Sequence, residues 1–232
     1  MNNIGIESPR KEIEIAVANG DLRKLLRLCG LLHGHYCPGS AMGVKAAARA
    51  VTELGVKSTG MEETVAIVET NSCFADGVQM VTGCSLGNNA LIYRDYGKTA
   101  FTLARRTGEA VRIAARPDGL SLEEREPEAM ALFKKVVKDR RGTQEDDRKL
   151  RHIWVDISFK MLDIPDDELF SISLSKIEIP SYARIFSSVK CSVCEENIME
   201  PRARLIDGQY FCLSCSGQPY YQLAGDGMAV VG

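Results

Sequence analysis

The sequence has few histidines, no long apolar run and no excess of charge of either sign. Only three of its 232 residues are histidine, and the formal net charge is -2. This balance argues against a general nucleic-acid-binding surface, which would normally be basic. No apolar run approaches the roughly 20 residues that span a bilayer, so we expect no membrane segment. The early charges near the N-terminus do not fit a secretory signal, and we expect a cytoplasmic protein.

Internal repeats and low-complexity tracts are also missing. A hydrophobic content of 45% and a charged content of 26% are those of an ordinary globular protein. The length suggests one large domain, or one domain with an appendage.

The apolar spacing predicts a mixture of helices and strands. Helices are expected over residues 8–18, 21–32, 40–54 and 74–83, and amphipathic helices over 121–162 with a break near 141–142. Strands are expected over 64–70, 90–93, 100–103, 110–114 and 169–179. Because these elements do not alternate strictly as βαβ units, we expect an α+β fold. The charged helices after residue 120 are expected to cover the sheet or to form an oligomer arm.

Four of the eight cysteines form two C-x-x-C pairs near the C-terminus. Two such pairs can complete a tetrahedral zinc shell of four thiolates. The ligands would be Cys191, Cys194, Cys212 and Cys215. Asp207-Gly208 between the pairs predicts a hairpin. We therefore expect a core domain over 1–185 and a treble-clef or zinc-ribbon module over 186–232, whose zinc is structural. Basic residues near the module leave a nucleic-acid-binding ribbon open, but its acidic neighbours disfavour it.

The segment His33-Gly-His35-Tyr-Cys37 contains two of the three histidines. Imidazole nitrogen and thiolate sulfur are the donors that borderline-soft transition metals prefer. Cys37 and Cys73 each directly precede an expected helix, and helix N-termini stabilise thiolates. Both cysteines are therefore candidate metal ligands or nucleophiles.

Further residues could complete this site. Asp76 follows Cys73 by one turn and could orient a histidine or act as a general acid or base. Cys84 could join only if the turn after its helix folds back, and it could equally be a packing residue. His33 could instead cap the preceding helix, and Cys29 is expected to be a buried hydrophobe. The turn over 95–98 could display ligand-contacting side chains or be a plain hairpin turn.

With these residues identified, the chain resembles the E-subunit family of formylmethanofuran dehydrogenase. The matching segments run over 33–39 with the following helix, 68–70 leading to Cys73, 81–84, and 94–98. The four-cysteine module looks like the treble-clef zinc finger that some family members carry. One difference is the turn over 87–90, which lacks the lysine that the family usually has there.

The resemblance implies an α+β core that pairs as a homodimer with exchanged helices. It also implies a pocket lined by His35, Cys37 and Cys73, with His33, Asp76 and Cys84 behind them. A second transition metal, for example zinc, is expected in this pocket. The family is related to methanogenesis.

The chain cannot be a formylmethanofuran dehydrogenase by itself. It has no extended pterin-binding region and no ferredoxin-like cysteine run. We expect a metal-binding accessory protein that serves a molybdenum or tungsten enzyme as a subunit or delivery factor. The alternative is a stand-alone cytosolic enzyme in which Cys37, Cys73 and Asp76 are catalytic, or in which the pocket holds a catalytic metal. A regulatory protein that docks through its zinc finger ranks third.

Overall fold

The computed structural model describes residues 8–57, 60–117, 119 and 121–232. The chain divides into two compact units, Met1–Pro180 and Ser181–Gly232. The boundary expected at 185/186 lies shortly after this division. Among the described residues, no helix combines the length and the apolar character needed to cross a membrane.

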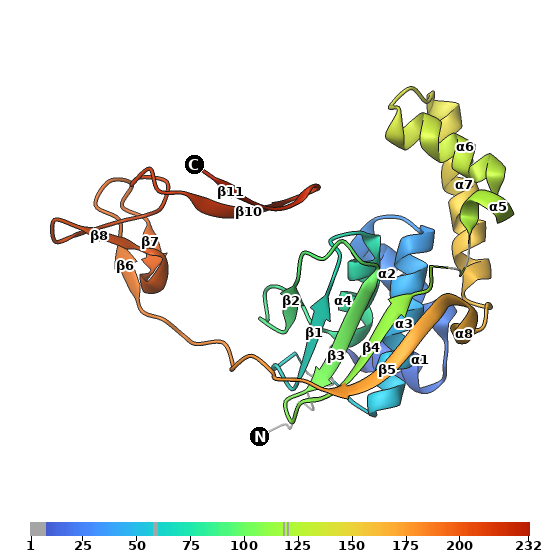
Figure 1. Ribbon diagram of the computed structural model, residues 1–232, viewed down its shortest axis with the longest axis horizontal. Helices are drawn as coiled ribbons and strands as arrows, with labels where there is room; N and C mark the ends of the chain where they lie inside the picture. Colours follow the sequence, from blue (N-terminus) through green and yellow to red (C-terminus); the bar gives the residue numbers. More distant parts are fainter. Residues whose placement is uncertain (1–7, 58–59, 118, 120) are drawn as a thin grey trace, which may run out of the picture. The chain divides into compact units, whose positions relative to one another are not determined.

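The first unit is built on a five-stranded mixed sheet (Figure 1), with the order β2-β1-β3-β4-β5. The strands are β1 (Thr64–Val68), β2 (Leu91–Tyr93), β3 (Ala100–Arg105), β4 (Glu109–Ala115) and β5 (Phe170–Lys176). The β1–β2 pair is parallel and the other pairs are antiparallel. Because helices and a mixed sheet share one unit, the α+β prediction is confirmed.

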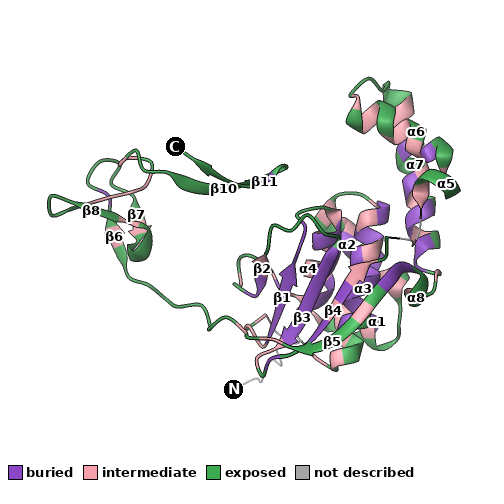
Figure 2. Cartoon of the chain, in the orientation of Figure 1, coloured by how far each residue is buried: buried purple, intermediate pink, exposed green. Residues whose placement is uncertain are grey.

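Four helices come before β2 in the described part of the chain: α1 (Lys11–Ala18), α2 (Leu22–His33), α3 (Pro38–Leu54) and α4 (Cys73–Thr82). As predicted, Asp21 caps α2, and its carboxylate accepts a hydrogen bond from the Lys24 amide at 2.9 Å. α3 packs against β3 and β4, and α4 packs against β1. The strands bury side chains such as Phe101 and Leu103 in the core between them and the helices. Figure 2 shows this buried interior.

α3 and α4 approach each other closely because glycine lies at their contact. A Cβ atom on Gly43 would fall 2.1 Å from the carbonyl oxygen of Phe74. A Cβ atom on Gly77 would fall 2.4 Å from the Val44 nitrogen. Only glycine permits this backbone approach. The contact holds the N-terminal ends of both helices side by side, and these ends carry Cys37 and Cys73.

The charged region after residue 120 forms α5 (Leu122–Arg125), α6 (Pro127–Phe133), a π-helical turn (Lys134–Lys138), α7 (Gln144–Met161) and α8 (Asp166–Leu169). The expected break falls between the π-helical turn and α7. α6 packs along α7, and α7 in turn contacts α3 (Figure 1). The Phe133 and Trp154 rings form part of the α6–α7 contact, with centroids 5.8 Å apart.

The second unit contains three two-stranded sheets. These pair β6 (Ser188–Lys190) with β7 (Asn197–Met199), β8 (Arg204–Ile206) with β9 (Gln209–Phe211), and β10 (Tyr220–Ala224) with β11 (Gly227–Val231). The predicted turn at Asp207-Gly208 joins β8 and β9, and both residues have positive φ. The β10–β11 hairpin follows the last cysteine and was not predicted from the sequence.

Candidate metal centre and thiolate pair

The first site lies where α2 ends and α3 begins. α2 ends at His33, and Gly34 takes a left-handed conformation with φ +83° that turns the chain. His35 is exposed, and Cys37 becomes the N-cap of α3. The backbone amide of Ser40 donates to Cys37 Sγ at 3.4 Å. The helix entry therefore fixes the cysteine sulfur and points a hydrogen-bond donor at it.

Cys73, the first residue of α4, lies beside Cys37. A Cβ atom on Gly39 would be 3.1 Å from Cys73 Cβ and 3.9 Å from Cys37 Sγ, so the glycine leaves room between the two cysteines. A hydrogen bond from the Cys73 thiol, with further ones from Ser40, lowers the pKa of Cys37 to about 4. The same hydrogen bond and burial raise the pKa of Cys73. The pair therefore holds one thiolate and one thiol near neutral pH.

His33 connects this thiolate to an acidic side chain. Its Nδ1 lies 2.7 Å from Asp76 Oδ2, and its Nε2 lies 3.5 Å from Cys37 Sγ. Burial alone would lower the pKa of His33, but the Asp76 hydrogen bond and the Cys37 thiolate raise it. Gln79 Nε2 donates to Asp76 Oδ1 at 3.1 Å. The carboxylate thus fixes the orientation of the imidazole, with Nε2 directed at the sulfur.

The donor set fits a transition metal. One ligand atom from each of His33, His35 and Cys37 lies within 4.8 Å of the others. A tetrahedral zinc ion with Zn–N of about 2.05 Å and Zn–S of about 2.3 Å separates its nitrogen and sulfur ligands by about 3.5 Å. The distance between His33 Nε2 and Cys37 Sγ is 3.5 Å. Asp76 would then hold the metal-bound histidine, as carboxylates commonly do.

The structure does not bring Cys84 into this group, which corrects its assignment to the pocket. Cys84 follows α4, whereas Cys73 begins it, and a helix of 10 residues spans about 15 Å. The Cys84 sulfur is buried 3.6 Å from Thr64 Oγ1. Cys29 is also fully buried, as expected. In the turn over 95–98, the Tyr93 hydroxyl donates to Asp95 at 2.6 Å.

Sequence reasoning missed two residues of the site, Ser40 and Gln79. The spacing of Cys37 and Ser40 is that of a capping box, in which each residue bonds the backbone of the other. The spacing could therefore have pointed to Ser40, but cysteine is an unusual N-cap residue. The contact of Gln79 with Asp76 depends on their i, i+3 spacing on α4.

The four finger cysteines form the second group. One sulfur from each of Cys191, Cys194, Cys212 and Cys215 lies within 4.8 Å of the others. The Cys212 amide donates to Cys191 Sγ at 3.4 Å, and the Cys215 amide donates to Cys212 Sγ at 3.2 Å. Backbone amides, led by that of Cys194, lower the pKa of Cys191 to about 6. The second unit is thus prepared to bind zinc through thiolates.

Comparison with known proteins finds a family match in each of the two units. Residues 32–171 match the family described as "FmdE, Molybdenum formylmethanofuran dehydrogenase operon". The chain belongs to the FmdE family. Residues 184–221 match the prokaryotic dksA/traR C4-type zinc finger. The resemblance seen in the sequence is therefore confirmed, and this FmdE protein carries a C-terminal finger whose cysteines indicate zinc binding.

The proteins similar to this FmdE chain include a curated relative and a solved structure. A probable S-adenosyl-L-methionine-binding protein of Archaeoglobus fulgidus is 39% identical over an alignment of 220 residues, and the match covers 93% of this chain. The chain spans only 58% of that relative's length. A crystal structure of a tungsten formylmethanofuran dehydrogenase FmdE-like protein from Syntrophus aciditrophicus shares the fold, with a TM-score of 0.53 and 24% identity. That likeness covers 86% of this chain and 94% of the other.

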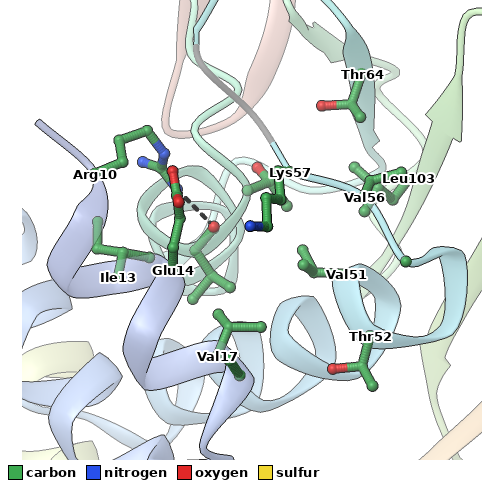
Figure 3. A pocket seen from close by; sticks show the side chains of 14 residues that line it. Arg10, Ile13, Glu14, Val17, Val51, Thr52, Val56, Lys57, Thr64 and Leu103 are labelled. Carbon is green, nitrogen blue, oxygen red and sulfur yellow. Dashed lines mark hydrogen bonds between the residues drawn. The ribbon is translucent and has the colours of Figure 1, made fainter. Parts of the chain in front are cut away.

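A separate cavity of about 310 Å³ lies between α1 and the C-terminal ends of α3 and α4 (Figure 3). Arg10, Glu14 and Lys57 contribute charged side chains to its wall. Cys37 and Cys73 begin the two helices whose other ends form this wall. The cavity is therefore distinct from the cysteine–histidine pocket.

Proposed function

We propose that His33, His35 and Cys37 bind one divalent transition metal ion, with zinc as the best fit, and that Cys73 or an external ligand takes the fourth position. The observation that carries this proposal is the 3.5 Å separation of His33 Nε2 and Cys37 Sγ, with Asp76 fixing the histidine at 2.7 Å. The exposure of His35 leaves the ion reachable from solvent. An ion bound here would act as a Lewis acid for whatever donor reaches the fourth position.

We further propose that the protein serves a molybdenum or tungsten enzyme as an accessory subunit or metal-delivery factor. The family description names an operon for molybdenum formylmethanofuran dehydrogenase, which supports a role beside that enzyme. A site with an open coordination position and a solvent-exposed ligand suits the transfer of an ion. A pull-down of the tagged protein from its own organism should recover such an enzyme, and recovery of no metalloenzyme would contradict this role.

A homodimer is part of the same proposal. The α5–α7 segment would be exchanged, and its contact with α3 would then be made to the partner chain. Light scattering on the purified full chain should give twice the chain mass. A monomer at all concentrations would contradict the exchange.

Metal content per chain tests the core site directly. Elemental analysis of the wild-type protein should give about two metal ions per chain, one for the finger and one for the pocket. Cys37→Ser should remove one ion and Cys212→Ser should remove the other. Cys84→Ala is the matched control, because this buried cysteine lies beyond the end of α4 that is opposite to Cys73. A wild-type value of one that falls to zero in Cys212→Ser alone would overturn the core site.

As a second function we propose that the chain binds S-adenosyl-L-methionine, which the name of the A. fulgidus relative states of that protein. The observation that favours it is the 310 Å³ cavity with charged groups of both signs in its wall. S-adenosyl-L-methionine carries an α-amino-acid group that needs partners of both signs. Calorimetric titration of the full chain should detect binding, and an absence of binding heat and of any shift in melting temperature would contradict it.

A further inference from the structure

The cavity at the C-terminal ends of α3 and α4 has the features of a small-molecule site. Its volume of about 310 Å³ is at the lower end of the range for pockets that enclose a ligand. Each of its walls comes from a different element: α1, the end of α3, the end of α4, β1 and β3. A hollow shaped by the packed core in this way is largely preformed.

Most of the wall is aliphatic. The apolar lining comes from Ile13, Val17, Val51, Val56 and Leu103, together with Ala18 and Val81. Figure 3 shows the Val51, Val17 and Leu103 side chains around the hollow. Such a lining favours an apolar group and excludes an unpaired charge. The body of a ligand in this cavity should therefore be apolar.

Charged side chains gather at one end of the cavity. Arg10 is fixed there, because one guanidinium nitrogen donates to the carbonyl oxygens of Met80 at 3.2 Å and Val81 at 2.7 Å. Glu14 accepts a hydrogen bond from the Ser8 hydroxyl at 3.2 Å. Figure 3 shows the Lys57 ammonium pointing in the direction of Glu14 and Arg10. Two cations and one anion thus lie around the same part of the wall.

Two of these groups have hydrogen-bonding capacity to spare. The Nε atom of Arg10 is buried without an acceptor in the part of the chain that the structure describes. A buried donor without a partner is costly, and such groups normally have one. Within the described ranges, Lys57 is in no ion pair. Arg10 Nε is itself covered by Gly83, so an oxygen-bearing anionic group on a ligand would be attracted by the charge of the guanidinium and by the Lys57 ammonium.

We infer that this cavity binds a small molecule that combines an α-amino-acid head with an apolar body. The carboxylate of the head would be held by Arg10 and Lys57, and its ammonium by Glu14. A simple anion would leave Glu14 without a partner, and a simple cation would be repelled by Arg10 and Lys57, whereas a zwitterion satisfies all three. This inference deepens the second proposed function at the head group alone, because the sulfonium and nucleoside of S-adenosyl-L-methionine are not apolar, and it does not depend on the metal pocket.

Ligand-detected NMR on the full chain tests the head group, with L-methionine as the probe. L-Methionine methyl ester lacks the carboxylate, and N-acetyl-L-methionine lacks the ammonium. We expect L-methionine to bind, and each analogue to bind at least about tenfold more weakly, since each loses one charge-assisted interaction. Equal binding of all three compounds would overturn the head-group assignment.

Variants of the wall locate the site. Glu14→Gln and Lys57→Met should each weaken L-methionine binding by about tenfold, and Lys134→Met, at an exposed lysine of the π-helical turn, should leave it unchanged. Val51→Trp should fill the cavity and abolish binding. If Val51→Trp fails to fold, the two charge variants still decide the question. Unchanged binding in both charge variants would place the ligand elsewhere.

The outcome is separable from both proposed functions. Cys37→Ser should leave L-methionine binding intact, because the thiolate lies at the other end of α3. If calorimetry detects S-adenosyl-L-methionine but L-methionine does not bind, the head-group inference fails and the second function stands. If L-methionine binds and the larger ligand does not, the second function fails and the inference stands.

Discussion

His33 Nδ1 lies 2.7 Å from Asp76 Oδ2, while the other nitrogen of the same ring lies 3.5 Å from Cys37 Sγ. The carboxylate comes from the first turn of α4, and the histidine is the last residue of α2. One imidazole therefore links three helices, because Cys37 caps α3. This arrangement determines which atom of His33 is available to a metal ion.

Removing the carboxylate should weaken metal binding without removing a ligand. Asp76→Ala is expected to lower the affinity of the pocket for zinc by about 10- to 100-fold, the usual effect of losing the group that orients a metal-bound histidine. Competition with a chromophoric chelator measures this change. Asp163→Ala is the control, since Asp163 pairs with Arg23 at the surface. Equal affinity in wild type and Asp76→Ala would show that His33 is not a ligand.

The metal-free pocket should contain a thiolate at mildly acidic pH. The Cys73 thiol lowers the pKa of Cys37 to about 4. At pH values between about 4 and the ordinary thiol pKa, Cys37 is therefore ionised in the folded chain and protonated in the unfolded chain. Its contribution to stability is fully present above the ordinary thiol pKa and is lost as the pH falls through about 4. Stability is lost on the acidic side because the pKa of Cys37 is lower in the folded chain than in the unfolded chain.

Thiolate absorbance at 240 nm measures this directly. At pH 6, wild-type protein that holds zinc only in the finger should show the absorbance of one thiolate more than Cys37→Ser does. This difference should disappear as the pH falls through about 4. In Cys73→Ala the midpoint should rise, because the hydrogen-bond donor is lost. A midpoint near 8.5 in the wild type would contradict the cysteine pair.

The glycine contact between α3 and α4 should be needed for both stability and the site. Gly77→Ala places a methyl group 2.4 Å from the Val44 nitrogen, so the helices must separate. We expect a loss of about 1–3 kcal/mol in the free energy of unfolding, the usual cost of overpacking. The separation should also weaken the Cys37–Cys73 hydrogen bond and raise the Cys37 pKa.

Denaturant unfolding measures the free energy of unfolding, and the absorbance titration at 240 nm measures the pKa of Cys37. Gly87→Ala is the matched control, because an added Cβ there meets nothing within 4 Å. Equal stability of Gly77→Ala and wild type would mean that the helices can separate without cost.

The position of each cysteine at a helix start was predictable from the sequence, but the contact between the two cysteines was not. Cys37 before Pro38 and Cys73 before a helix predicted two thiols at helix entrances, and both were found there. Their mutual contact depends on the approach of Gly43 and Gly77, which are far apart in the chain, and no local pattern signals it. Cys84 was grouped with the pocket because of its motif, but the length of α4 separates it from Cys73.

The finger unit should depend on its metal for folding. All of residues 181–232 are described, and only Cys191 and Gly227 among them are buried. With so little apolar burial, the free energy of metal binding must supply most of the folding free energy.

Cys212→Ser, or treatment of the wild type with a strong chelator, should therefore expose this unit to trypsin. The sheet unit, which has its own core, should survive as a fragment ending near residue 180. Cys84→Ala, a substitution inside that core, should leave the finger resistant. A finger that resists trypsin after its zinc is removed would contradict metal-dependent folding.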